Sequence, residues 1–188
     1  MKKIKEILIP AVALFVICLI ATALLGGTNL LTAEKIALVA EKAAEEARFS
    51  VCEDAEKFEE VKVDVDSNEY VCYLGKDSDG KTVGYAVTTQ DKSYGGAIEI
   101  MTGFDADGKI TGIEILKIDD TPGLGMNAKK DNFKNEFKGK SGELTVSKSA
   151  TDENEIQALT GATITSKAVT RCVNLATQIF LQAQGGEN

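Results

Sequence analysis

The hydrophobic residues of this chain are concentrated in one long run near the N-terminus. Residues 7–25 carry no charge, and after Glu6 the next charged side chain is Glu34. At about 1.5 Å per residue, a helix over residues 7–25 is about 28 Å long, close to the ~30 Å hydrocarbon thickness of a bilayer. The pattern predicts a single transmembrane helix within a membrane anchor at residues 1–26.

A cleaved signal peptide is the alternative interpretation of this run, with the small residues 21–23 as the cleavage site. The run continues through residues 24 and 25 and is long for a signal peptide, which favours an anchor. Lys2, Lys3 and Lys5 precede it, and positive charge favours the cytoplasmic side. We therefore expect a protein of the cell (cytoplasmic) membrane with a cytoplasmic N-terminus and an extracytoplasmic domain at residues 27–188.

After the anchor, the pattern predicts first a helix and then strands. Thr32–Phe49 is rich in helix-forming residues, with Thr32 as its candidate cap. Four later segments have the composition of strands: Tyr70–Leu74, Thr82–Thr89, Gly96–Thr102 and Ile110–Ile118. The acidic segments 77–80 and 105–108 end in Gly, which is typical of turns between antiparallel strands. Calcium binding is their alternative interpretation, but neither segment continues into an EF-hand loop with its terminal Glu.

The remaining segments complete a fold in which helices flank the strands. We expect a short helix at Lys129–Phe137, a strand at Glu143–Ser147 and a lead-in segment at Asp152–Leu159. Apolar residues then recur at helical spacing: Ala168, Val169, Cys172, Leu175, Ala176, Ile179 and Phe180. Because the helices do not alternate with the strands, the fold class is α+β, with an antiparallel sheet flanked by helices.

Composition and charge argue against several classes of function. The chain has 21 basic and 29 acidic side chains, a net charge of −8, and no basic patch with interleaved aromatic residues, so we expect no nucleic-acid binding. His is absent, which removes His-based catalysis and His ligands for metals or haem. The cysteines form no C-x-x-C pair, so no metal site is expected. For Cys52, Cys72 and Cys172, a Cys52–Cys72 disulfide and simple burial are both open.

The most informative stretch is Thr160-Gly161-Ala162-Thr163-Ile164-Thr165-Ser166, which leads into the C-terminal helix. The first N–H groups of a helix lack partners within it, and the aligned peptide dipoles favour negative charge there. Small residues allow a phosphate to approach the backbone, and the hydroxyl groups would surround it, so the stretch predicts a phosphate site. The simpler alternative is that Thr163 or Thr165 only caps the helix.

Residues 160–166 resemble the S/T-G-A-T-x-T-S motif of two related flavin-binding subunits. These are the G subunit of the Rnf electron-transport complex and the C subunit of the sodium-pumping NADH:quinone oxidoreductase. In both families FMN is bound covalently, as a phosphoester of the last Thr in the motif. The resemblance implies covalent FMN at Thr165, with cofactor contacts at Thr160, Gly161, Ala162 and Thr163.

Two further segments resemble the same families. Asp120-Thr121-Pro122-Gly123-Leu124-Gly125 is similar to their E-T-P-G-L-G loop near the isoalloxazine ring, with Asp120 in place of Glu. Tyr94-Gly95-Gly96 is similar to their Y-x-G element before a strand. By residue type alone, the first is a type II turn and the second a glycine bend. The resemblance implies that both segments bind the cofactor.

The resemblance also implies a function. It indicates a membrane flavoprotein subunit that relays electrons through covalent FMN in a ferredoxin:NAD oxidoreductase coupled to Na⁺ or H⁺ translocation. The implied partners are the other membrane subunits and a flavin transferase that uses FAD. No G-x-G-x-x-G motif follows a predicted strand, so we expect no hydride exchange with NAD and no catalysis by this chain alone. The alternatives are the C-type subunit of the sodium pump and a non-redox FMN-binding membrane module.

Overall fold

The N-terminal part of the protein is one long helix. The computed structural model describes residues 2–185, and the chain divides into two compact units, residues 1–42 and 43–188. Helix α1 spans Lys2–Val51, and from Ile7 onward it is long and apolar enough to cross a membrane. The lysine side chains on which the predicted orientation depends lie outside the described part of the molecule. The structure thus contains a helix suited to the predicted membrane span.

The helix predicted at Thr32–Phe49 is not a separate element. α1 continues through this segment, and Thr32 lies inside it, where its hydroxyl donates a hydrogen bond to the carbonyl of Thr28 at 2.9 Å. The prediction that Thr32 caps a helix is therefore wrong. The Gly26-Gly27 pair does not interrupt α1, because each Gly inside a helix costs only about 1 kcal/mol relative to Ala and no Pro follows.

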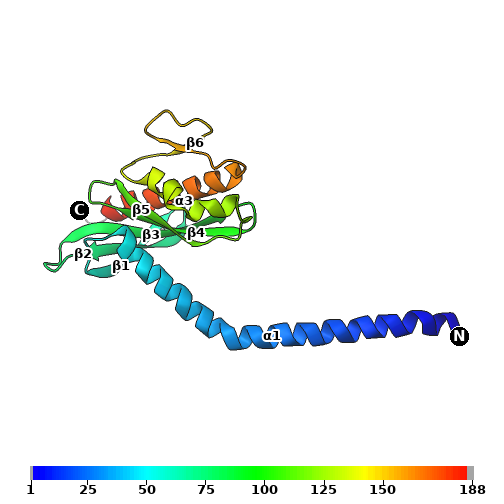
Figure 1. Ribbon diagram of the computed structural model, residues 1–188. Coiled ribbons are helices and arrows are strands. Elements are labelled where there is room, and N and C mark those ends of the chain that lie inside the picture. Colours follow the sequence, from blue (N-terminus) through cyan, green and yellow to red (C-terminus); the bar gives the residue numbers. More distant parts are fainter. Residues whose placement is uncertain (1, 186–188) are drawn as a thin grey trace. The chain divides into compact units, whose positions relative to one another are not determined.

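Five strands form an antiparallel sheet in which each strand pairs with the next along the chain (Figure 1). Their bounds are β1 (Lys57–Val65), β2 (Asn68–Lys76), β3 (Thr82–Lys92), β4 (Ala97–Phe104) and β5 (Ile110–Lys117). The four predicted strands are confirmed. The predicted acidic turns are confirmed as well, because Asp77 and Asp105 each accept backbone N–H bonds from residues two and four positions further on.

Strand β1 was not predicted from the sequence pattern. It pairs with β2 on one side only, and Val63 is the residue of β1 whose side chain is buried. The remaining positions carry many charged side chains, which is how edge strands avoid pairing with other chains. Val61, Val63 and Val65 nevertheless alternate with Lys62 and Asp64, the period of a half-buried strand, so the sequence held a signal that the prediction missed.

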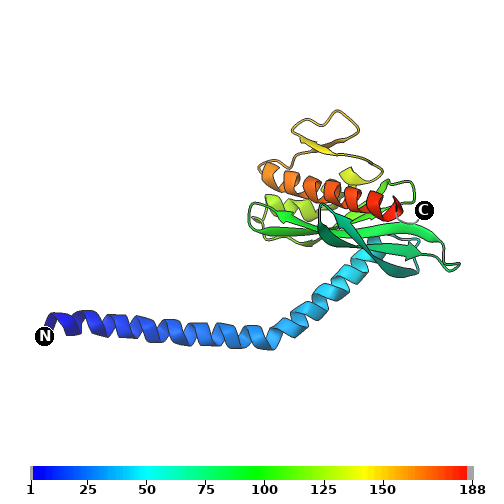
Figure 2. The same ribbon diagram turned by 180° about the vertical axis from the view of Figure 1, so that it is seen from behind.

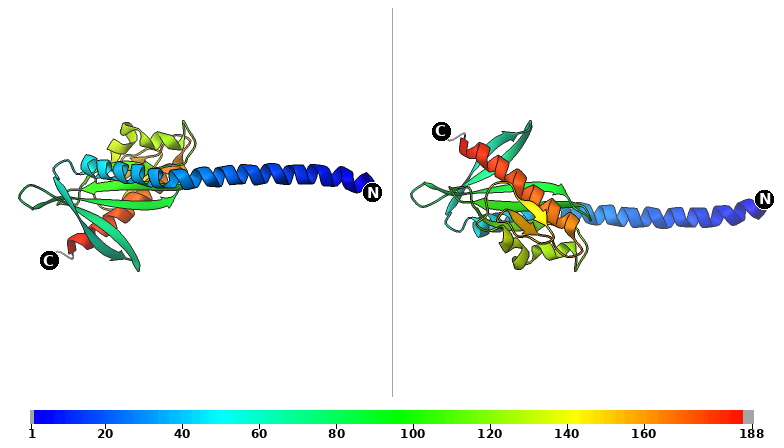
Figure 3. Two further views of the ribbon diagram at one scale, coloured as in Figure 1. Left: turned by 90° about the horizontal axis from the view of Figure 1, so that it is seen from below. Right: turned by 90° about the horizontal axis from the view of Figure 1, so that it is seen from above.

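Both faces of the sheet are covered, and neighbouring residues of β3 point into different cores. Tyr85 and Val87 belong to the larger core, whereas Ala86 belongs to the smaller one. Helix α3 (Thr163–Gly185) covers the larger core and crosses the strands obliquely, as Figure 2 and Figure 3 show. The smaller core packs the last turns of α1, including Val51, against Ala86 and Met101.

The segment between β5 and α3 contains short elements. These are η1 (Gly125–Lys129), α2 (Asp131–Lys134), η2 (Asn135–Phe137), β6 (Thr145–Ser147) and β7 (Glu155–Gln157). The helix predicted at Lys129–Phe137 is thus broken into single turns that bury Phe133 and Phe137. β6 confirms the strand predicted at Glu143–Ser147. Its parallel partner β7 lies in the lead-in segment, where no strand was predicted.

The buried cysteines are divided between the two faces of the sheet. Cys72 belongs to the larger core and Cys52 to the smaller one, so a disulfide between them would have to pass through the sheet. Burial raises the pKa of the Cys52 and Cys172 thiols to about 12. Both thiols are therefore protonated and unreactive at neutral pH.

Candidate functional site

Three loops meet at one end of the sheet and enclose a pocket. They are the turn between β3 and β4, the segment after β5 and the approach to α3, and together they line a volume of about 630 Å³. The lining residues are Tyr94, Asp120, Thr121, Leu124, Gly125, Gly161, Ala162, Thr163, Ile164 and Thr165. The sequence named all of these except Ile164 as site residues, so the structure brings its three predicted segments together.

The start of α3, where backbone N–H groups lack partners within the helix, lines this pocket. The carbonyl of Ala162 accepts the N–H of Ser166 at 3.0 Å, so Ala162 is the N-cap and α3 begins at Thr163. Thr163 and Thr165 both lie within the first turn, so the alternative in which one of them serves only as the N-cap does not hold. Ala162 has no side-chain acceptor, and the first-turn N–H groups have no carbonyl within the helix. Residues 163–165, which carry these groups, line the pocket.

Two residues of the motif shape the turn before the helix. Gly161 has a φ of 74°, a left-handed conformation that Gly adopts without the steric cost of a Cβ. The Ser166 hydroxyl accepts the N–H of Leu159 at 2.9 Å and donates to the Ala162 carbonyl at 3.1 Å. Ser166 therefore holds the turn together, a structural role that the sequence did not distinguish from the roles of the neighbouring threonines.

Asp120 connects the three loops. Its carboxylate accepts hydrogen bonds from the Ser93 hydroxyl at 2.5 Å, the Gly95 N–H at 2.6 Å and the Thr165 hydroxyl at 2.6 Å. The residue is 4% exposed. Burial favours the neutral acid, but the three hydrogen bonds outweigh it and hold the pKa of Asp120 below its ordinary value. Asp120 is therefore a carboxylate at neutral pH.

Close approach explains two of the glycines. A Cβ on Gly125 would lie 2.6 Å from both the Asp120 carboxylate and the Thr165 hydroxyl, and a Cβ on Gly95 would lie 2.2 Å from the carbonyl of Asp119. Gly123 has a different reason: its φ is 79°, and the Leu124 N–H donates to the Thr121 carbonyl at 3.2 Å. The predicted type II turn is thus confirmed.

Some predicted site residues do not line the pocket: Gly95, Gly96, Pro122, Gly123 and Thr160. Gly95 acts through its N–H on Asp120, and Pro122 and Gly123 form the turn that leads to Leu124. The sequence missed Ser93, although its hydroxyl directly precedes the Tyr94-Gly95-Gly96 segment. It also missed Ile164, which occupies the variable position of the motif and is 55% exposed.

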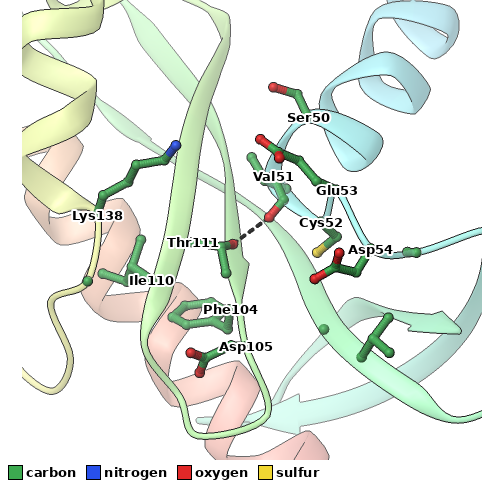
Figure 4. Close-up of a pocket in the computed structure, with 14 residues that line it drawn as sticks. Ser50, Val51, Cys52, Glu53, Asp54, Phe104, Asp105, Ile110, Thr111 and Lys138 are labelled. Atoms are coloured by element: carbon green, nitrogen blue, oxygen red, sulfur yellow. Dashed lines mark hydrogen bonds between the residues drawn. The ribbon is translucent and has the colours of Figure 1, made fainter. Parts of the chain in front are cut away.

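A second pocket, of about 380 Å³, lies where the end of α1 meets β4, β5 and the loop that contains Lys138 (Figure 4). The Thr111 hydroxyl donates to the carbonyl of Val51 there. Acidic side chains from Glu53, Asp54 and Asp105 surround this pocket. None of the residues predicted for cofactor binding lines it.

Comparison with known proteins identifies the family. Residues 1–51 match the model of the RnfG N-terminal region, and residues 93–178 match that of the FMN-binding domain. The G subunit of the Na(+)-translocating ferredoxin:NAD(+) oxidoreductase complex of Acetobacterium woodii is 42% identical over 184 residues, which cover 89% of this chain and 88% of the relative. The chain belongs to the G-subunit family of ion-translocating oxidoreductase complexes. The family predicted from the three motifs is confirmed.

Other members and a more distant structure agree with this assignment to the G-subunit family. The G subunit of the proton-translocating ferredoxin:NAD(+) oxidoreductase complex of Clostridium ljungdahlii is 43% identical over 135 residues, 71% of this chain and 70% of the relative. The crystal structure of NqrC from Shewanella oneidensis matches with a TM-score of 0.54 and 21% identity, over 63% of this chain and 62% of that one. This likeness concerns the fold and confirms the predicted α+β class.

The residues of the pocket fit the FMN that binds to members of the matched domain family. Its volume is within the ~300–1,000 Å³ that small-molecule sites occupy. The α3 N-terminus suits a phosphate, and Gly125 leaves space where a Cβ would collide with Thr165. Tyr94, Leu124 and Ile164 offer apolar surface beside it. FMN as the cofactor of this member of the family is confirmed, whereas the individual binding residues, Thr165 included, stay predictions.

Proposed function

We propose that this chain relays electrons through FMN bound covalently to Thr165, as the flavoprotein subunit of a membrane-bound ferredoxin:NAD oxidoreductase that translocates Na⁺ or H⁺. The observation that carries the proposal is the position of Thr165. Its side chain lies in the first turn of α3, lines the larger pocket and donates its hydroxyl proton to a buried carboxylate. When bound, FMN supplies the electron-transfer chemistry.

The residues that line the pocket would have different roles in binding FMN. The first-turn N–H groups of α3 would bind the phosphate, because the positive end of a helix dipole favours an anion. Leu124 lies against the turn that precedes α3, with its Cδ2 atom 3.1 Å from the position that a Cβ on Gly161 would take. Together with Tyr94 and Ile164, Leu124 would exclude water from the ring system.

Among the threonines of the motif, Thr165 has the strongest support as the attachment point. Thr160 does not line the pocket. Thr163 lines it, but Thr165 is the one whose hydroxyl hydrogen-bonds to Asp120. A hydroxyl becomes a useful nucleophile only beside a group that can take its proton, and this selects Thr165.

Thr165→Val tests the attachment, with Thr163→Val and Thr177→Val as controls. Thr177 lies in the same helix, and its hydroxyl donates to the carbonyl of Val173, outside the pocket. After expression with a flavin transferase, covalent flavin is measured by fluorescence of the denatured protein band and by peptide mass spectrometry. We expect none in Thr165→Val and normal attachment in Thr177→Val. The lost hydrogen bond to Asp120 should cost about 1.5–3 kcal/mol of unfolding free energy.

Two results would contradict the attachment proposal. One is a wild-type chain without any flavin adduct after expression with the transferase. The other is a Thr165→Val variant that retains the adduct, and loss of the adduct in Thr163→Val alone would move the attachment point to Thr163.

The proposed partners are the other membrane subunits of the complex and the flavin transferase. The relatives at 42% and 43% identity are themselves subunits of such complexes, which supports the first part. The chain alone offers no nicotinamide motif, so the isolated flavin-loaded protein should not oxidise NADH. Measurable NADH oxidation by the purified chain would contradict this part of the proposal.

The proposed topology is a single span within residues 1–26, with the N-terminus in the cytoplasm and residues 27–188 outside. Its support is the apolar part of α1 from Ile7 onward and the three lysines that precede this part in the sequence. In spheroplasts, added protease should digest the domain and leave the N-terminus protected. N-terminal sequencing should find residues 1–25 retained, and a mature chain that starts near Leu24 would contradict the anchor.

A further inference from the structure

The contact between Thr165 and Asp120 places a nucleophile beside a base. The Thr165 hydroxyl donates to one oxygen of the Asp120 carboxylate at 2.6 Å, and the two residues are 1% and 4% exposed. A Thr hydroxyl is a weak nucleophile at neutral pH, and enzymes activate such groups with an adjacent base that is itself held in place. The pair meets this requirement, because Asp120 is adjacent to Thr165 and is held in place by hydrogen bonds from Ser93 and Gly95.

The surroundings of the pair support a chemical role over a purely structural one. Both side chains line the larger pocket, at the N-terminus of α3 where a phosphate is favoured. Gly125 contributes no side chain at the point where a Cβ would touch both reacting groups. A structural hydrogen bond would not need a pocket beside it or a glycine over it.

We propose that Asp120 is the general base that accepts the Thr165 proton when FMN is esterified to this chain. The inference rests on the proposed attachment at Thr165. The donor is a flavin dinucleotide, FAD, in which a diphosphate joins FMN to AMP. The bond between the Thr165 Oγ1 and the FMN phosphorus forms, and the phosphorus–oxygen bond to AMP breaks. AMP leaves with that electron pair, and the hydroxyl proton passes to Asp120 and from there to solvent.

A carboxylate of low basicity is sufficient for this step. The hydroxyl proton does not have to leave before the phosphorus is attacked, because a general base removes it while the new bond forms. Protein kinases use an Asp in the same way, to accept the proton of a substrate hydroxyl. The hydrogen bonds that keep Asp120 ionised therefore do not prevent it from acting as the base.

The test measures the rate of flavin attachment to the full-length apoprotein after addition of purified transferase and FAD. Asp120→Asn keeps the size of the side chain but cannot accept a proton. Asp120→Glu keeps the carboxylate. Asp77→Asn is the matched control, because Asp77 also accepts backbone N–H bonds but lies in the β2–β3 turn and does not line the pocket. The adduct is followed by fluorescence of denatured samples and by mass spectrometry.

General-base catalysis contributes about 10²–10⁴-fold, so Asp120→Asn should attach flavin at least about 100-fold more slowly than wild type. Asp120→Glu should stay within about 10-fold and Asp77→Asn should be unchanged. Circular dichroism and thermal unfolding verify that each variant is folded. A folded Asp120→Asn protein with the wild-type rate would overturn the proposal. So would a folded Asp120→Glu protein that attaches flavin at least about 100-fold more slowly than wild type, and this second comparison does not need a folded Asp120→Asn protein.

Failure of this inference can be told from failure of the proposed function. Thr165→Val in the same assay should give no adduct at any time. If it still carries flavin, the attachment point is wrong and the proposed function fails. If Thr165→Val has no adduct and Asp120→Asn reaches the wild-type rate, the attachment stands and only the role of Asp120 is refuted.

Discussion

Two pockets in the domain are each built at the end of a helix, but the ends have opposite polarity. The larger pocket, of about 630 Å³, lies at the N-terminus of α3, and the smaller one, of about 380 Å³, at the C-terminus of α1. The first turn of α3, whose N–H groups lack partners within the helix, lines the first pocket, whereas Val51, Glu53, Asp54 and Asp105 line the second. A phosphate is stabilised at a helix N-terminus and repelled at a C-terminus surrounded by acids.

Each pocket also contains a threonine hydroxyl that donates a hydrogen bond, and the two acceptors differ in kind. Thr165 donates to the side-chain carboxylate of Asp120, which can take a proton. Thr111 donates to the backbone carbonyl of Val51, which cannot. A cavity with a threonine hydroxyl is therefore not enough to identify a phosphate-attachment site. The polarity of the helix end and the ability of the acceptor to take a proton distinguish the two pockets.

Among the substitutions that should distinguish the two pockets, one at Gly125 should have the largest effect on flavin attachment and stability. In Gly125→Ala the new Cβ would overlap the Asp120 carboxylate and the Thr165 hydroxyl, each 2.6 Å away. We expect flavin attachment to slow by at least about 10-fold and the unfolding free energy to fall by about 1–3 kcal/mol. The measurements are adduct fluorescence and chemical denaturation.

Gly112→Ala is the matched control for Gly125→Ala. It lies in β5 near Val51 and Lys138, whose atoms are 3.7 Å or more from the position of its Cβ, an ordinary contact distance. Flavin attachment should be unchanged. Equal attachment in the two alanine variants would mean that the space over the Thr165–Asp120 pair is not needed.

A smaller effect is expected at Thr111, on stability alone. Thr111→Val removes the donor to the Val51 carbonyl, one of the last carbonyls of α1 that have no partner in the helix. The unfolding free energy should fall by about 1 kcal/mol, and flavin attachment should stay normal. A Thr111→Val variant that loses covalent flavin would break the distinction between the two pockets.

The smallest expected effect is on acid stability and concerns Asp120. Its pKa is lowered in the folded protein, so its carboxylate stabilises the fold above the ordinary pKa of about 3.8, and this contribution is lost as the pH falls through the folded value. The thermal unfolding temperature of wild type should therefore fall more between pH 6 and pH 3 than that of Asp120→Asn. If the unfolding temperatures of the two proteins fall in parallel, the three hydrogen bonds do not keep the Asp120 carboxylate ionised.

Much of the fold follows from local sequence patterns. The uncharged run at residues 7–25 predicts a membrane helix, the acidic Asp77 and Asp105 turns predict hairpins, and Pro122-Gly123 predicts a type II turn. Each depends only on residues that are continuous in the sequence, so their outcome does not need the rest of the chain. The cap predicted at Thr32 failed although it is local, because α1 continues through Thr32 and its hydroxyl donates to the carbonyl of Thr28 instead.

The sequence by itself determined that hydroxyls and small residues precede α3, that glycines flank Leu124, and that an acidic residue begins the loop before it. Only the tertiary structure decided which hydroxyl meets that acid. Asp120 and Thr165 are 45 positions apart, and their contact joins the loop after β5 to the first turn of α3. The antiparallel register places the end of β5 beside the start of β4, so Ser93 and Gly95 before β4 reach the same carboxylate. A contact between distant residues depends on the packing of every element between them, and no local pattern records it.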